Sequence, residues 1–110
     1  SAPPRFDWEG TQVSAGWVTT FSEYTVASEN RVTPIDLDVP MDVAALLGCA
    51  VTTGLGIVFN NAKLMPGQSM AVFGVGGVGL NVIQGAALIN AYPIVAIDMY
   101  EEKLKQALFY

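Results

Sequence analysis

The feature that most constrains this chain is a glycine-rich turn between two apolar runs. Residues 72 to 80 read VFGVGGVGL, and Gly74, Gly76 and Gly79 satisfy the pattern G-x-G-x-x-G. The apolar run before the turn predicts a buried strand, and GVGLNVIQGAALIN predicts a helix after it. Such a turn can hold the phosphates of a dinucleotide, because the first amides of the helix point at them. The alternative is a purely structural turn, whose glycines only allow a strand and a helix to pack.

Each glycine of the turn has an expected role. Gly74 allows the tight turn, Gly76 lets the backbone approach a pyrophosphate, and Gly79 lets the helix pack closely on the strand. The whole predicted cofactor-binding turn comprises Gly74, Val75, Gly76, Gly77, Val78 and Gly79.

A second apolar run strengthens the dinucleotide interpretation. PIVAID predicts another buried strand, which ends at Asp98, about 20 residues beyond the motif. A carboxylate there accepts hydrogen bonds from the adenosine ribose, and its charge repels a 2′-phosphate, which favours NAD over NADP. Asp98 could also cap the helix predicted in MYEEKLKQALF, and the two roles are compatible.

The rest of the chain is expected to change character near residue 50. Residues 1–12 read as irregular, residues 16–28 predict a strand or a bent pair of strands, and residues 29–40 predict a short strand that ends in turns. From Met41 the residues predict a short helix that stops at Gly48. Apolar residues at helical spacing then predict a second helix over residues 50–64.

Composition excludes some classes of function. The net charge is −5 and the five basic residues are scattered, so the chain offers no surface for nucleic acid. Residues 64–97 carry no charge, but Pro66, Pro93 and several glycines interrupt them, which favours a buried parallel sheet over a membrane span. A single cysteine and an N-terminus without an apolar leader indicate a cytoplasmic protein.

Three segments together resemble the zinc-dependent, medium-chain alcohol dehydrogenases. They are LGCAVTTGLG at 47–56, PGQSMAVFGVGGVGLNVIQGA at 66–86 and IVAIDMYEEKL at 94–104, and TTFSEYTVASENRVTPID at 19–36 is similar to the strand region that precedes them in that family. The resemblance implies an α/β fold in two parts. Residues 50–110 would form part of an NAD-binding Rossmann domain (a doubly wound parallel sheet), and residues 1–49 the β-rich end of a GroES-like catalytic domain.

The resemblance also implies roles for individual residues. Cys49 matches a cysteine that ligates the catalytic zinc, and Thr53 and Val78 match residues beside the nicotinamide ring. Asp98 matches the acid that binds the adenosine ribose, and Lys103 matches a lysine near that ribose. From the residues alone, a lone cysteine such as Cys49 is more often a small buried hydrophobe than a metal ligand.

One residue departs from the family pattern, and most of the zinc ligands are absent. Tyr100 stands where the family frequently has a small polar residue. A catalytic zinc takes three protein ligands, whereas this chain has one cysteine and no histidine. We therefore expect an inactive fragment of a homo-oligomeric enzyme that transfers a hydride between a small alcohol and NAD, with zinc as Lewis acid, and so interconverts the alcohol and its aldehyde or ketone. The alternative is a non-catalytic nucleotide-binding βαβ module with a regulatory or structural role.

Overall fold

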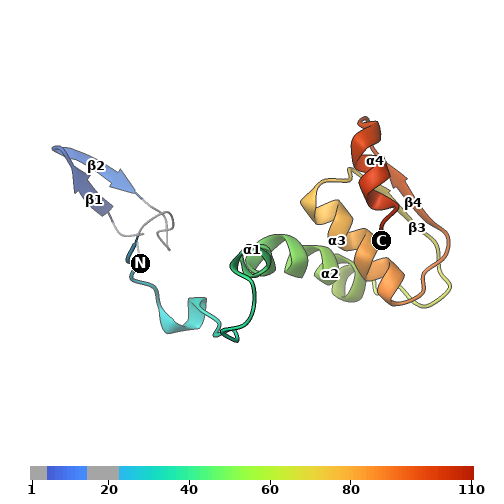
Figure 1. Cartoon of the computed structure of the whole chain (residues 1–110), viewed down its shortest axis with the longest axis horizontal. Coiled ribbons are helices and arrows are strands. Elements are labelled where there is room, and N and C mark those ends of the chain that lie inside the picture. The colour runs from blue at the N-terminus through green and yellow to red at the C-terminus, as the bar shows by residue number, and fades with distance from the viewer. Residues whose placement is uncertain (1–4, 15–22) are drawn as a thin grey trace. The chain divides into compact units, whose positions relative to one another are not determined.

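The computed structural model describes residues 5–14 and 23–110, and the chain divides into two compact units (Figure 1). The first unit is Ser1–Leu37 and the second is Asp38–Tyr110. The boundary predicted between residues 49 and 50 refers to domains of a longer enzyme, and it stays a prediction.

The first unit contains a β-hairpin where irregular structure was expected. Strands β1 (Arg5–Trp8) and β2 (Thr11–Ser14) pair antiparallel, with Trp8 opposite Thr11. The two turn residues, Glu9 and Gly10, have φ angles of 50° and 79°. Positive φ at both positions is what a two-residue type I′ hairpin turn requires. The prediction of irregular structure was therefore wrong for residues 5–12, because Glu-Gly is a weaker hairpin signal than Asn-Gly or Asp-Gly, and residues 1–4 lie outside the described part of the chain.

The predicted short strand over residues 29–40 is also wrong. The 3₁₀ turn η1 (Glu29–Arg31) is followed by extended backbone and turns, and no strand occurs within residues 23–40. Of the strand predicted over residues 16–28, residues 23–28 are not in a strand, and residues 16–22 lie outside the described part of the chain. β-branched and aromatic residues favour a strand only where a neighbouring strand supplies hydrogen bonds and packing.

The second unit begins with one continuous helix rather than two. It runs through α1 (Met41–Leu46), the π-helical turn η2 (Leu47–Val51), α2 (Thr52–Gly56) and the π-helical turn η3 (Ile57–Asn61). Gly48 does not end the helix as predicted, since a glycine inside a helix costs only about 1 kcal/mol relative to alanine. By length and composition alone, the helix from Met41 to Asn61 could cross a membrane, and 11% of its most apolar window is buried.

The predicted alternation of strands and helices is confirmed in the remainder of the unit. Strand β3 (Met70–Phe73), helix α3 (Gly77–Leu88), strand β4 (Ile94–Ile97) and helix α4 (Glu101–Ala107) follow in order. The two strands pair in parallel, from Met70 opposite Ile94 to Phe73 opposite Ile97. This βαβα arrangement is part of a Rossmann fold, and it brings the glycine turn and Asp98 to the same edge of the sheet.

Helices α3 and α4 both contribute to a core on one face of the two strands. Val72 of β3 packs in one cluster with Ile83 of α3 and Ala107 of α4, and Ala96 of β4 lies against that cluster. The strand residues that alternate with these, such as Phe73 and Val95, are exposed. The described part of the chain therefore covers one face of the β3–β4 pair and leaves the other open.

The long helix packs side by side with α3, and glycines make the contact close (Figure 1). A Cβ atom at Gly54 would overlap the side chain of Asn81, and one at Gly85 would lie 3.1 Å from the Val58 side chain. Both pairs have the same offset in the sequence, so the helices run parallel over two turns. The glycines thus set the spacing between the helix that carries Cys49 and the helix that follows the glycine turn.

We predict that Gly54→Ala destabilises the chain by about 1–3 kcal/mol, because the new methyl group overpacks a helix contact against Asn81. Gly48→Ala is the matched control. Gly48 lies in the same helix with nothing near the position of an added Cβ, so alanine there should raise stability by up to about 1 kcal/mol. Urea unfolding followed by circular dichroism measures both effects, and equal stability of the two variants would contradict the packing argument.

Candidate dinucleotide-binding site

The glycine turn has the conformation that its sequence predicts. Gly74 has a φ of 89°, a region that glycine occupies most readily, and its amide donates to the Ile97 carbonyl at 2.8 Å. A Cβ at Gly79 would overlap the Gly74 carbonyl oxygen and lie 3.6 Å from Val72. The first glycine is therefore needed for the turn, and the third for the close packing of α3 on the turn and strand.

Gly76 differs from the other two motif glycines. Nothing lies within 4 Å of the position that its Cβ would take, and its φ of −89° is open to any residue. No fold requirement within the described chain explains a glycine here. Open space at the start of α3 suits the approach of a phosphate to backbone amides, which is the role expected of the second glycine.

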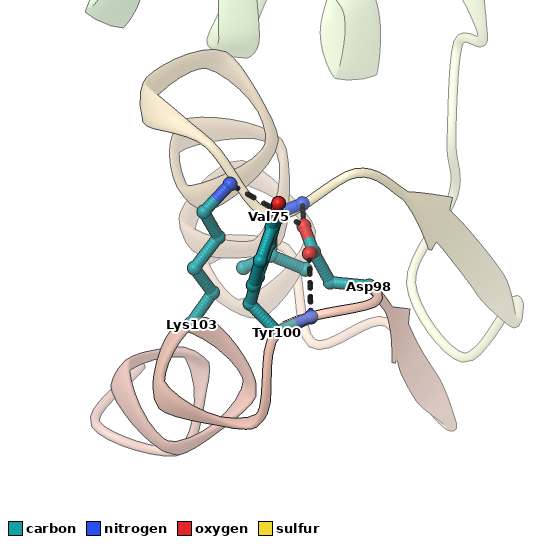
Figure 2. Close-up of polar contacts among 4 residues, drawn as sticks. All are labelled: Val75, Asp98, Tyr100 and Lys103. Atoms are coloured by element: carbon teal, nitrogen blue, oxygen red, sulfur yellow. Dashed lines mark hydrogen bonds and ion pairs between the residues drawn. The ribbon is translucent and has the colours of Figure 1, made fainter.

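Asp98 is bonded directly to the glycine turn (Figure 2). Its Oδ2 accepts a hydrogen bond from the Val75 amide at 2.7 Å, and its Oδ1 accepts one from the Tyr100 amide at 3.0 Å. The side chain of Asp98 is only 8% exposed, and Val75 is buried. A carboxylate accepts about four hydrogen bonds, so two acceptor positions remain for ribose hydroxyls.

These bonds make Asp98 a stronger acid than usual. The hydrogen bond from the Val75 amide is the largest cause that lowers the pKa of Asp98, and the bond from the Tyr100 amide is the next. The positive charge of Lys103 lowers this pKa further, whereas desolvation opposes the shift. The carboxylate is therefore charged at neutral pH, as an acceptor of two hydroxyl donors must be.

Lys103 and Tyr100 lie beside Asp98, at the end of the site where the adenosine ribose is expected. The Lys103 Nζ lies 4.0 Å from Asp98 Oδ2 and 4.9 Å from the centroid of the Tyr100 ring. Figure 2 shows both side chains extending from the start of α4 toward the glycine turn. Lys103 was expected near the ribose, and the structure places it beside the acid that would bind that ribose.

The residues expected at the nicotinamide end come from the long helix and from the start of α3. Cys49 and Thr53 are one helical turn apart and both are exposed. Their neighbour Gly54 lies against α3, where an added Cβ would be 3.0 Å from the Val78 carbonyl oxygen. The structure thus brings Thr53 and Val78 onto adjacent turns of two packed helices, and their contact with nicotinamide stays a prediction.

The described residues do not form a zinc site. Within residues 5–14 and 23–110, no group of three or more His, Cys, Asp or Glu side chains is placed to hold a metal ion. A catalytic zinc takes three protein ligands, and Cys49 can supply one of them. The role of Cys49 as a zinc ligand stays a prediction.

Comparisons with known proteins agree with this arrangement. The chain is 52% identical over 85 residues to S-(hydroxymethyl)glutathione dehydrogenase of Saccharomyces cerevisiae, which covers 77% of this chain and 22% of that protein. It is 49% identical over 89 residues to the protein of the same name from Synechocystis sp., covering 81% and 24%. No protein-family model matches the chain.

Solved structures share the fold. A benzyl alcohol dehydrogenase from Acinetobacter calcoaceticus superposes with a TM-score of 0.79 at 33% identity, covering 84% of this chain and 25% of that one. An alcohol dehydrogenase zinc-binding domain protein from Burkholderia ambifaria gives 0.78 at 32% identity, with the same coverage of both chains. The aligned part of the chain belongs to the medium-chain alcohol dehydrogenase family, and the chain spans about a quarter of the length of these relatives.

Two features of the site were not predicted from the sequence. The bond between Asp98 and the Val75 amide joins residues far apart in the chain, and no local pattern indicates it. The contact of Lys103 with the Tyr100 ring had a signal, since residues three apart at the start of a helix are neighbours. Tyr100 was noticed as a departure from the family, but no partner was assigned to it.

We predict that Asp98 makes the stability of the chain depend on pH in acid. Its pKa in the folded chain lies below the ordinary value of 3.8, so its ionisation stabilises the fold above that pH. This contribution is lost as the pH falls through the folded pKa. Urea unfolding between pH 2 and 7 should show the loss in the unchanged chain and a flatter profile in Asp98→Asn.

Glu102→Gln serves as the control, because Glu102 is exposed in the helix α4 that follows Asp98 and the substitution removes the same charge. It should keep the acid profile of the unchanged chain. An Asp98→Asn profile that parallels the unchanged chain would show that the bonds to Val75 and Tyr100 do not stabilise the fold.

Proposed function

We propose that this chain carries the coenzyme-binding part of an NAD-dependent dehydrogenase, which transfers a hydride from a small alcohol to NAD and so forms the matching aldehyde or ketone, or runs the reverse reaction. The observation that carries the proposal is the bond from the Val75 amide to Asp98, which holds a charged acceptor beside a glycine turn that is open at Gly76. The relatives support an oxidoreductase, since they are named as dehydrogenases.

The chain's own residues would bind and orient the coenzyme. The amides at the start of α3 would donate to the pyrophosphate, and the free acceptor positions of Asp98 would receive the ribose hydroxyls. Val78 and Thr53 would lie at the nicotinamide. When bound, NAD supplies the hydride acceptor.

The substrate is proposed only as a small alcohol or aldehyde, because the names of the relatives differ in substrate. A cytoplasmic location and association with further copies of the chain belong to the same proposal. The location is supported by the lone cysteine in the sequence. Self-association is supported by the apolar residues exposed on the open face of the strands, among them Phe73 and Val95.

A non-catalytic nucleotide-binding role is the second candidate, and the lack of a metal-binding group among the described residues favours it. The two candidate functions differ in how much the nicotinamide ring contributes to the affinity for the coenzyme. A dehydrogenase site should bind NADH more tightly than ADP, because Val78 and Thr53 would contact the ring. A module that recognises only the adenine nucleotide should bind the two equally.

We predict that Gly76→Ala leaves the fold intact and weakens NADH binding. The position is open and its φ suits alanine, but the methyl group would occupy the space where a phosphate approaches the backbone. Loss of such hydrogen bonds costs about 1–3 kcal/mol, equivalent to roughly a ten- to hundredfold higher Kd. Fluorescence titration with NADH measures the change, and thermal unfolding confirms the fold.

Gly48→Ala is the control for this titration, since Gly48 is also open but is not part of the glycine motif. It should bind NADH as the unchanged chain does. Equal binding by Gly76→Ala would contradict the role of the turn as a phosphate cradle.

We also predict that the purified 110-residue chain forms no NADH from NAD and a primary alcohol, with or without added zinc. The described residues hold no group of three metal ligands, so an alkoxide would lack its stabilising cation. Absorbance at 340 nm over a long incubation is a sufficient assay. Zinc-dependent turnover would overturn this prediction.

A further inference from the structure

The Tyr100 side chain has a contact that the binding of NAD does not itself require. Its ring faces the Lys103 ammonium at 4.9 Å, while the same ammonium lies 4.0 Å from Asp98. Tyr100 is 60% exposed, so the ring adds little to the core. Its backbone amide, which bonds to Asp98, would remain with any side chain other than that of proline.

The ring matters because the ion pair alone is weak. The Lys103 side chain is 44% exposed, and its ammonium lies at the outer limit of an ion pair with Asp98. Exposed pairs of this kind hold a flexible lysine poorly. An aromatic face attracts the same ammonium from a second direction, and two restraints confine it better than one. Figure 2 shows the Tyr100 and Lys103 side chains running together toward the carboxylate.

We propose that Tyr100 is a positioning residue that holds Lys103 against Asp98 and thereby sets the preference of the site for NAD over NADP. This inference rests on the proposed coenzyme site. Asp98 repels a 2′-phosphate, whereas a lysine that is free to move attracts one. While the ring holds Lys103 on Asp98, the ammonium is not free to swing toward that phosphate. Without the ring, Lys103 gains this freedom.

The first test needs no coenzyme. The pKa of Asp98 is measured by NMR titration of its carboxyl carbon in the full chain, where Lys103 is the charged side chain that the structure places against it. Tyr100→Ala should raise this pKa, and Tyr100→Phe, which keeps the ring, should not change it. Lys103→Met should raise the pKa as well, and adding Tyr100→Ala to Lys103→Met should have no further effect. An unchanged pKa in Tyr100→Ala overturns the positioning role.

The second test compares the affinities for NADPH and NADH. Tyr100→Ala should raise the affinity for NADPH relative to NADH by about threefold, which is the size expected from an exposed cation–π contact. Tyr100→Phe should keep the preference of the unchanged chain, and the double variant with Lys103→Met should lose the gain. An unchanged ratio in Tyr100→Ala overturns the role in specificity. If the pKa shifts but the chain binds neither coenzyme, the positioning role stands, whereas the coenzyme site and the specificity drawn from it are overturned.

Discussion

The candidate site depends on two hydrogen bonds between the glycine turn and the end of β4. The Gly74 amide donates to the Ile97 carbonyl, and the Val75 amide donates to Asp98, so two consecutive amides of the turn are bonded to consecutive residues of the neighbouring strand. The first bond continues the backbone pairing of β3 and β4 beyond Phe73, and the second joins the turn to the side chain of the residue that follows β4. They hold the acid, the turn and the start of α3 in one rigid arrangement.

The glycines of the second unit act through packing as much as through turns. Gly79 lets α3 approach the turn, and Gly54 and Gly85 let the long helix lie close beside α3. A closely packed helix pair positions Thr53 next to the turn without any direct bond between them. At Gly76, in contrast, no neighbour in the described chain excludes a side chain. Of the motif glycines, Gly76 is therefore the one whose presence is best explained by ligand binding.

Sequence analysis predicted the βαβα unit well, because its signals are local and agree with one another. Charge-free runs, a glycine turn and acidic residues at the start of α4 all indicate the same alternation, and the structure confirms it. Before residue 50, where the signals are weak, the predictions succeeded only in part: the helix that begins at Met41 is confirmed, whereas the strand predicted over residues 29–40 is wrong. The hairpin at Glu9 and Gly10 was missed, and the predicted stop at Gly48 was wrong because packing and continuity of the helix outweigh the preference of one glycine.

By itself, the sequence determined the family and the α/β class of the second unit, and it predicted the residues at which a dinucleotide would bind. These follow from spacing along the chain, which the backbone of a strand, turn and helix converts directly into position. Only the tertiary structure decided which separate elements meet: the Val75 amide of the turn with Asp98, and Gly54 of the long helix with α3. Contacts between separate elements depend on distances in space that no local pattern encodes.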